Sequence, residues 1–180
     1  MTGKLFGAVV VAAAIASTLA VAAPANPPPA CRAWDVDLPK EWQPWAQAPT
    51  PLAVTTAVAD VGSAVVPIGK KVSLAMAPSQ SVHLAVGMPK IDEPPDAHSG
   101  LLALHVPEAG LYWVAASGGV WIDIVVDGAI IDPVETDGGP LCASLGKALK
   151  YRLKAGNSVI QLVRARGAHV DLLVAREPEK

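Results

Sequence analysis

Apolar and polar residues alternate along most of the chain from about residue 52 onward. Leu149, Tyr151 and Leu153, for example, alternate with basic residues without interruption. Successive side chains of a strand point to opposite faces, so this period of two predicts strands that bury one face. The strands expected on this basis are 52–59, 72–76, 82–86, 102–106, 111–116, 120–126, 149–153, 159–163 and 170–174.

Turn residues separate these segments at the short, regular intervals that are typical of sandwich folds. Pro78-Ser79-Gln80 predicts a hairpin between 72–76 and 82–86, and Asp127-Gly128 is the strongest short hairpin signal in the chain. We therefore expect an all-β fold: an antiparallel β-sandwich, jelly-roll-like, with about eight or nine strands. Beyond the leader no segment has a helical stripe, which argues against helices.

The first 22 residues have the features of a signal peptide. Lys4 precedes an apolar stretch over residues 5–16, and Ala20-Val21-Ala22 has the small residues of a cleavage site. An uncleaved anchor is the alternative, but Ser17-Thr18 interrupts the apolar run and prolines follow it. The sequence thus predicts cleavage after Ala22 and export to the periplasm or the exterior of a bacterial cell.

Residues 23–51 differ from the rest of the chain in being rich in proline and lacking either period. They contain Trp34, Trp42 and Trp45, and Pro44 is expected to end any helical turn that begins near Pro39. The predicted organisation is a signal peptide at 1–22, an extended arm at 23–51, a sandwich domain at 52–176 and a tail at 177–180.

Cys31 in the arm and Cys142 late in the chain are the two cysteines. An even count in an exported protein favours a disulfide, here one that ties the arm to the sandwich, with two separate thiols as the alternative. Closing so long a loop stabilises a fold by roughly 4–5 kcal/mol in the chain-entropy model.

The charge balance excludes some classes of partner. Removing the leader takes away Lys4 and no acid, so the net charge changes from −2 to −3. A weakly acidic chain is not suited to nucleic acid or to an anionic membrane surface. There is no second long apolar run, so no membrane span is expected in the mature chain. Gly-x-Ser-x-Gly elbows and phosphate-binding loops are also missing from the sequence.

Trp113 and Trp121 flank the turn at Ser117-Gly118-Gly119, and Asp123 shares a strand face with Trp121. If both rings were exposed they would form a platform for stacking sugars, with Asp123 accepting hydroxyl hydrogen bonds. If buried, they would close the sandwich, and we expect burial for at least one. The arm tryptophans are expected to dock the arm on the end of the sandwich.

Two sets of residues offer metal ligands. His83, His105 and His169 fall on the polar faces of three expected strands and would form a nitrogen-ligand site if those strands were neighbours. Solvent-facing histidines are the alternative. The acidic stretch around Asp132, Glu135 and Asp137, which follows Asp127, supplies oxygen ligands for a structural Ca²⁺, with a solvated loop as the alternative.

Three segments taken in order carry a family resemblance: VPEAGLY at 106–112, WIDIVVDG at 121–128 and LKAGN at 153–157. The order resembles that of bacterial prepeptidase-C-terminal-type and carbohydrate-binding-type jelly-roll domains, over roughly residues 65–175. This resemblance implies an exported, non-catalytic accessory or binding domain.

These observations predict a protein that binds rather than catalyses, with a glycan or another cell-envelope protein as its ligand. One alternative is a small periplasmic metalloprotein or dioxygenase-like protein that uses His83, His105 and His169. The other is a structural subunit whose exposed β edge joins an envelope assembly.

Overall fold

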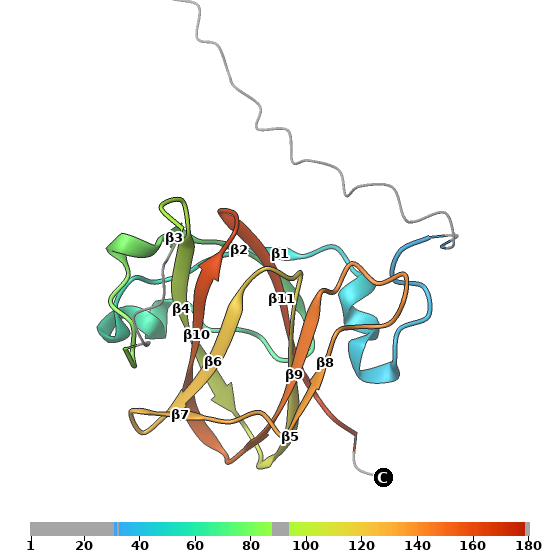
Figure 1. Ribbon diagram of the computed structural model, residues 1–180. Helices are drawn as coiled ribbons and strands as arrows, with labels where there is room; N and C mark the ends of the chain where they lie inside the picture. Colours follow the sequence, from blue (N-terminus) through green and yellow to red (C-terminus); the bar gives the residue numbers. More distant parts are fainter. Residues whose placement is uncertain (1–30, 32, 88–93, 179–180) are drawn as a thin grey trace, which may run out of the picture.

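The alternating segments form two β-sheets that pack face to face, which confirms the predicted β-sandwich (Figure 1). The computed structural model describes residues 31, 33–87 and 94–178; the predicted signal peptide lies outside them. Sheet A contains, in spatial order, β1 (Thr50–Ala53), β2 (Lys71–Ala75), β11 (His169–Arg176), β5 (Gly110–Ala116), β9 (Lys147–Leu153) and β8 (Glu135–Asp137). Sheet B contains β3 (Ala77–Pro78), β4 (His98–Val106), β10 (Gly156–Ala165), β6 (Trp121–Val126) and β7 (Ala129–Ile131).

All neighbouring strands pair antiparallel except β1 and β2, which are parallel. The described residues form eleven strands, more than the eight or nine expected. The additional ones are short, since β3, β7 and β8 have two or three residues each. Segments of this length are too short to show a period of two in the sequence.

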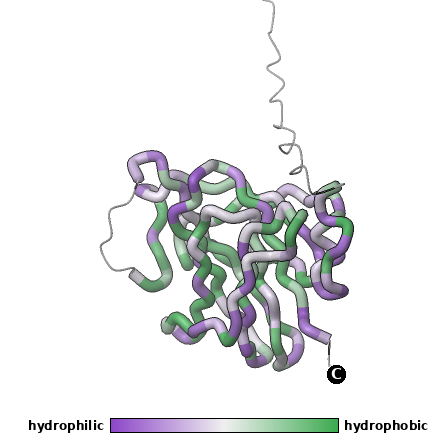
Figure 2. Tube along the Cα trace, turned by 45° about the vertical axis from the view of Figure 1, so that its right-hand side comes forward, coloured by the Kyte–Doolittle hydropathy of each residue, from purple (hydrophilic) through white to green (hydrophobic). Residues whose placement is uncertain are grey.

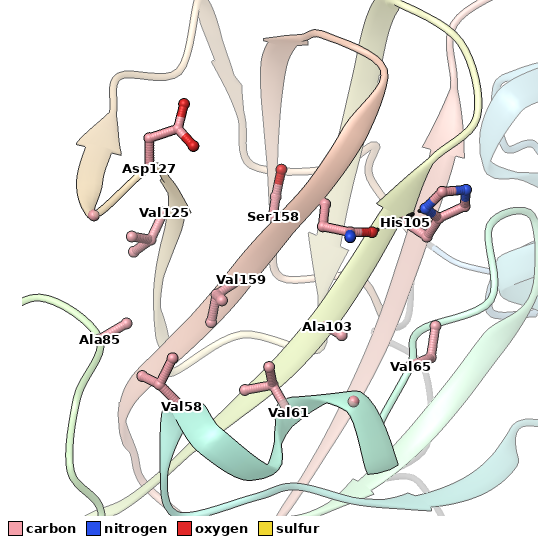
Figure 3. Close-up of a pocket in the computed structure, with 13 residues that line it drawn as sticks. Val58, Val61, Val65, Ala85, Ala103, His105, Val125, Asp127, Ser158 and Val159 are labelled. Atoms are coloured by element: carbon pink, nitrogen blue, oxygen red, sulfur yellow. Dashed lines mark hydrogen bonds between the residues drawn. The ribbon is translucent and has the colours of Figure 1, made fainter.

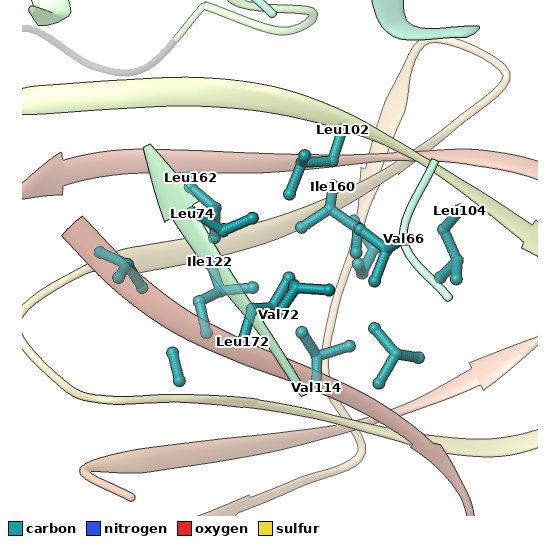
Figure 4. Close-up of a cluster of buried hydrophobic side chains, with 14 of the residues drawn as sticks. Val66, Val72, Leu74, Leu102, Leu104, Val114, Ile122, Ile160, Leu162 and Leu172 are labelled. Atoms are coloured by element: carbon teal, nitrogen blue, oxygen red, sulfur yellow. The ribbon is translucent and has the colours of Figure 1, made fainter. Parts of the chain in front are cut away.

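The inward-facing residues of both sheets form one apolar core (Figure 4). Leu102 and Leu104 of β4 and Ile160 of β10 face Leu74 and Leu172 across the interior. Between these positions lie residues that face outward, and Figure 2 shows hydrophobic and hydrophilic positions interchanging along the chain. Each sheet therefore also has an outer face, whose side chains do not contribute to this core.

The turn between β6 and β7 is the two-residue hairpin that Asp127-Gly128 predicts. Asp127 and Gly128 have φ values of 50° and 78°. Positive φ at both central residues is the signature of a type I′ turn, which matches the twist of the flanking strands. This turn fixes the register of β6 and β7, in which Val125 is opposite Ile130.

Two expected strands are wrong. Residues 82–86 do not pair with β2; instead residues 82–87, called the strap below, cross the outer face of sheet B outside any strand. Residues 52–59 are a strand only to Ala53, and a 3-10 helix, η2 (Val58–Ser63), follows. A further 3-10 turn, η3 (Ser79–Ser81), stands where the hairpin turn was expected. A segment that lies across a sheet can bury alternate side chains as a strand does. Its sequence then shows the same period of two although it forms no strand.

The chain between β1 and β2 covers the edge of β4. Thr55 and Leu101 exchange backbone hydrogen bonds of 2.9 Å in both directions, and the Val66 N–H donates to the Ala103 carbonyl at 2.9 Å. Covering an edge in this way removes a site for unwanted strand pairing. It also places η2 beside the outer face of sheet B.

The arm docks on the sandwich through its tryptophans, but on the outer face of sheet A rather than on the expected end of the sandwich. Its 3-10 helix η1 (Lys40–Ala46) buries Trp42 and Trp45 against a cluster that includes Trp113 and Leu173. The predicted disulfide between Cys31 and Cys142 is present and ties the arm to the loop between β8 and β9. The arm (blue) lies at the side of the sandwich in Figure 1.

Pro44 does not end η1, contrary to the expectation. The Trp42 N–H donates to Pro39 and the Gln47 N–H donates to Pro44, at 2.8 and 3.2 Å. The helix thus consists of two short turns, and Pro44 starts the second, where a missing N–H costs nothing. Among the described residues, no helix has the length and apolar character needed to cross a membrane.

Candidate functional site

The outer face of sheet B contains a groove of about 390 Å³ (Figure 3). The residues that line it come from η2, the strap, β4, β6 with its turn, and β10. They are Val58, Val61, Gly62, Val65, Ala85, Ala103, His105, Val125, Asp127, Gly128, Asn157, Ser158 and Val159. A mostly apolar pocket of this size with a few polar groups is typical of a ligand site.

The groove has an apolar floor and apolar walls. Ala103 on β4 and Val159 on β10 are paired in register, and Val159 is also paired with Val125 on β6, so these three side chains share one row of the sheet. Val58 and Val61 project from η2 toward this row (Figure 3). The small residues Gly62, Ala85 and Ala103 among the valines leave the groove unfilled by the protein's own side chains.

Polar groups gather at one end of the groove. His105 Nδ1 and Asn157 Oδ1 are 2.9 Å apart and form a hydrogen bond across β4 and β10. Asp127 lies in the β6–β7 turn and, apart from His105, is the one ionisable residue that lines the groove. Its exposed carboxylate therefore sets the electrostatic character of this end.

A buried glutamine holds the strap on the sheet. Gln161 on β10 has 0% of its surface exposed although it faces outward. Its Oε1 accepts from the Val86 N–H at 3.1 Å, and its Nε2 donates to the Val86 carbonyl at 3.1 Å. A further bond of 3.4 Å runs from Nε2 to Asp123 Oδ2. The Gln161 side chain thus anchors the strap, and with it the wall of the groove at Ala85.

Asp123 and Trp121, two of the residues predicted to bind a ligand, lie on this same outer face. The Trp121 Nε1–H donates to Asp123 Oδ1 at 2.8 Å, and Lys147 Nζ stands 5.4 Å from the centroid of the indole ring. Trp121 is 54% exposed, whereas Asp123 is 7% exposed. The ring is therefore fixed in place yet open to solvent.

Trp113 lies on the opposite side of the molecule, so the structure does not form the expected platform of two tryptophans. It is 4% exposed, and the ring of Trp42 packs edge-on against it with centroids 5.1 Å apart. Strands β5 and β6 belong to different sheets, and the outward positions of each therefore face away from one another. The expectation that at least one of the two rings is buried is confirmed.

The three histidines proposed as ligands are dispersed. His105 is at the groove, His83 is on the strap, and His169 is on β11 in sheet A. Strands β4 and β11 are in different sheets, so His105 and His169 do not meet. Within the described ranges no group of three histidine, cysteine or acidic side chains is arranged to hold a metal ion.

The acidic stretch makes contacts within the protein. Glu135 accepts a hydrogen bond from Lys150, and Asp137 Oδ1 accepts one of 2.7 Å from the Gly139 N–H. Glu135 and then Glu177 raise the pKa of Lys150 through these hydrogen bonds, and Lys150 Nζ also lies 4.4 Å from the centroid of Trp113. Glu135 is thus bound to Lys150 beside the arm rather than grouped with Asp132 as a calcium ligand.

Sequence reasoning missed the groove and Gln161. The groove combines segments that are far apart in the chain, and a pattern of neighbouring positions does not reveal such a site. Gln161 did offer a signal, since it is a polar residue inside the apolar run 159–163. A buried side-chain amide requires partners, and these lie in the strap.

No protein-family model matches the chain, and no curated protein matches it. The resemblance to prepeptidase-C-terminal-type and carbohydrate-binding-type domains therefore stays a prediction.

Proposed function

We propose that the protein is an exported binding module whose groove on sheet B takes an apolar segment of another cell-envelope protein. The observation that carries this proposal is the distribution of exposed apolar side chains. Among the described residues seven large hydrophobic side chains are exposed, and four of them, Val58, Val65, Trp121 and Ile130, belong to this one side of the molecule. Grouped exposed apolar residues mark interaction surfaces, whereas scattered ones do not.

The extent of this surface favours a protein over a small apolar molecule. Val58, Val65 and Ile130 are 39–49% exposed and stand at or beyond the edge of the groove. A small molecule within 390 Å³ would cover the floor but leave the outlying side chains in water. A polypeptide partner would cover both, which gains the free energy of burying the additional apolar area.

The charge at the groove indicates one further property of the partner. Asp127 supplies a carboxylate at the polar end, and no basic side chain lines the groove. A partner segment with apolar residues followed by a lysine or arginine would complement this arrangement and would associate faster at low salt. The disulfide and the predicted leader support an extracytoplasmic setting for both proteins.

Val65→Lys tests the proposal, because it places a charge on the exposed rim and leaves the core untouched. Val134→Lys is the matched control, since Val134 is similarly exposed but does not line the groove. Tagged wild type and both variants are expressed in the native host, cross-linked and isolated, and co-isolated proteins are quantified by mass spectrometry. We expect one protein to be lost with Val65→Lys and retained with Val134→Lys. Identical sets of proteins from the two variants would reject the proposal.

A glycan is the second candidate ligand, and the exposed, fixed ring of Trp121 is the observation that favours it. A ring already held by Asp123 and Lys147 loses little freedom when a sugar stacks on it. Isothermal titration against a glycan panel tests this function. Heat that disappears with Trp121→Ala and persists with Val65→Lys would support glycan binding, and no heat with any sugar would reject it.

A further inference from the structure

The contact between the strap and Gln161 has the geometry of peptide recognition. Both hydrogen bonds of the Gln161 amide go to the backbone of a single residue, Val86, one to its N–H and one to its carbonyl. The N–H and C=O of one residue point to the same side only where the chain is extended. An amide that bonds both groups therefore recognises the extended conformation of one residue, here Val86 in a bend of the chain, and is indifferent to the side chain that this residue carries.

Few bonds hold the strap besides these. Of its described backbone groups, the His83 N–H donates to the Thr56 carbonyl at 2.7 Å, and the Val82 N–H closes a local turn to Ser79 at 3.0 Å. The strap forms no ladder with a strand, and its residues 82–86 are half-buried or exposed. The Gln161 amide is thus the main polar contact that holds its distal half.

The surfaces beneath the arm and the strap differ in chemistry. The arm covers Trp113, Leu173 and other apolar side chains, and a disulfide secures it. The strap bonds to Gln161, which in turn contacts Asp123. Lifting the arm would expose the fully buried Trp42 and Trp45 to water, which is costly. The strap only half-buries Val82, Leu84 and Val86, and the amide and carboxylate groups that it releases are satisfied by water. The strap is therefore the more easily displaced of the two covers.

We infer that the strap occupies, within the same chain, the backbone-binding position of the site, and that a partner segment displaces it and takes over both hydrogen bonds to Gln161 with one residue in the conformation of Val86. This inference rests on the proposed function and adds the conformation of the partner. The exchange replaces two amide hydrogen bonds with two of the same kind, so the backbone contributes little net free energy. The apolar floor at Ala103, Val125 and Val159 and the charge of Asp127 then select which segment binds.

A synthetic peptide with the strap sequence SVHLAVG, residues 81–87, is the probe. In the Val86→Pro variant the strap lacks the N–H that bonds Gln161 Oε1, so its hold on the sheet is weakened. The double variant Val86→Pro/Gln161→Met has the same altered strap but lacks the side-chain amide that would form hydrogen bonds with the peptide. We expect the peptide to bind Val86→Pro roughly tenfold more tightly than the double variant, because two neutral hydrogen bonds together change affinity by about that factor. Fluorescence titration with labelled peptide measures both constants, and circular dichroism confirms that both variants are folded.

A measurement on the wild type does not depend on either variant folding. Saturating peptide is expected to accelerate hydrogen exchange at the Val86 amide, because the displaced strap loses its acceptor on Gln161. Equal affinity for the two variants, or unchanged exchange at Val86, would overturn the inference. If this inference fails but the partner is still lost specifically with Val65→Lys, the proposed function stands without the inference. If Val65→Lys also loses no partner, the inference and the proposed function are both rejected.

Discussion

Removing the disulfide between Cys31 and Cys142 should be the most costly change that leaves the core intact. The two cysteines are 111 residues apart, so the bond closes a long loop that contains every strand from β1 to β8. In the chain-entropy model the unfolded chain regains about 5 kcal/mol of conformational freedom when such a loop is opened. That value is a large share of the roughly 5–15 kcal/mol by which domains are stable.

The full loss appears only if the arm stays docked without the bond. If the arm detached, the native state would gain conformational entropy as well as the unfolded state. The free energy of unfolding would then fall by less. Contacts independent of the disulfide favour docking: Asp35 accepts two hydrogen bonds of 2.7 Å from Ser144, and the Trp45 Nε1–H donates to Ser144 at 2.8 Å. We therefore expect Cys31→Ser/Cys142→Ser to remain folded with its arm in place.

Urea unfolding of oxidised wild type and of the double variant measures the loss, and near-ultraviolet circular dichroism reports on the buried tryptophans. The expected result is a free energy of unfolding lower by about 4–5 kcal/mol with the tryptophan bands retained. A loss below about 1 kcal/mol with those bands retained would refute the entropy argument. A small loss with the bands gone would instead show that the arm needs the bond to dock.

Trp45→Ala should lower the free energy of unfolding by about 3–5 kcal/mol because this arm side chain is fully buried against sheet A, whereas Trp121→Ala should cost far less because Trp121 is exposed. Urea unfolding compares the two variants, and equal losses would contradict the packing described. Gly100→Ala should destabilise by about 1–3 kcal/mol, since the added Cβ would stand 2.4 Å from Val54 Cγ2, and an unchanged melting temperature would refute this. Burial raises the pKa of Tyr151 above its ordinary value of 10.0, so the unfolded chain loses this proton first. Its contribution to stability is complete below pH 10.0 and declines as the pH rises further. Tyr151→Phe should remove this decline in melting temperatures recorded between about pH 9 and 12, and an identical alkaline decline in both proteins would exclude the tyrosine as its cause.

Most of the sandwich is predictable from alternation because every second side chain of its long strands enters the core between the sheets. Leu149, Tyr151 and Leu153 of β9 do so, as do Val170, Leu172 and Val174 of β11, whereas Leu173 packs under the arm. The Asp127-Gly128 turn is predictable for a different reason, since positive φ at two successive residues selects for these types. Interactions between residues close together in the sequence determine both the strands and this turn, so the sequence pattern reveals them.

The arm and the strap, which cover the outer faces of sheets A and B, are much less predictable. Val82, Leu84 and Val86 alternate like a strand, yet none of them pairs with a neighbouring strand, and the backbone of Val86 bonds the side chain of Gln161 instead. The arm was predictable in outline from its tryptophans and Cys31. Which sheet it covers depends on the strand order, and the strand order is not visible in the sequence.

The candidate site was predictable only in part, for the same reason. Trp121 and Asp123 share a face because they are two positions apart on β6, which the sequence shows. Trp113 is on β5, across the turn, and the chain changes sheets between the two strands. The groove combines η2, the strap and three strands, and the topology alone brings these together.

Site-specific photo-cross-linking in the native host would detect a partner protein on the outer face of sheet B. A photoreactive phenylalanine analogue is placed at Val65 on the rim of the groove and, in a second protein, at Val134 away from it. We expect one envelope protein to be cross-linked from Val65 and not from Val134. The same products from both positions, or none from Val65, would show that no partner binds this face.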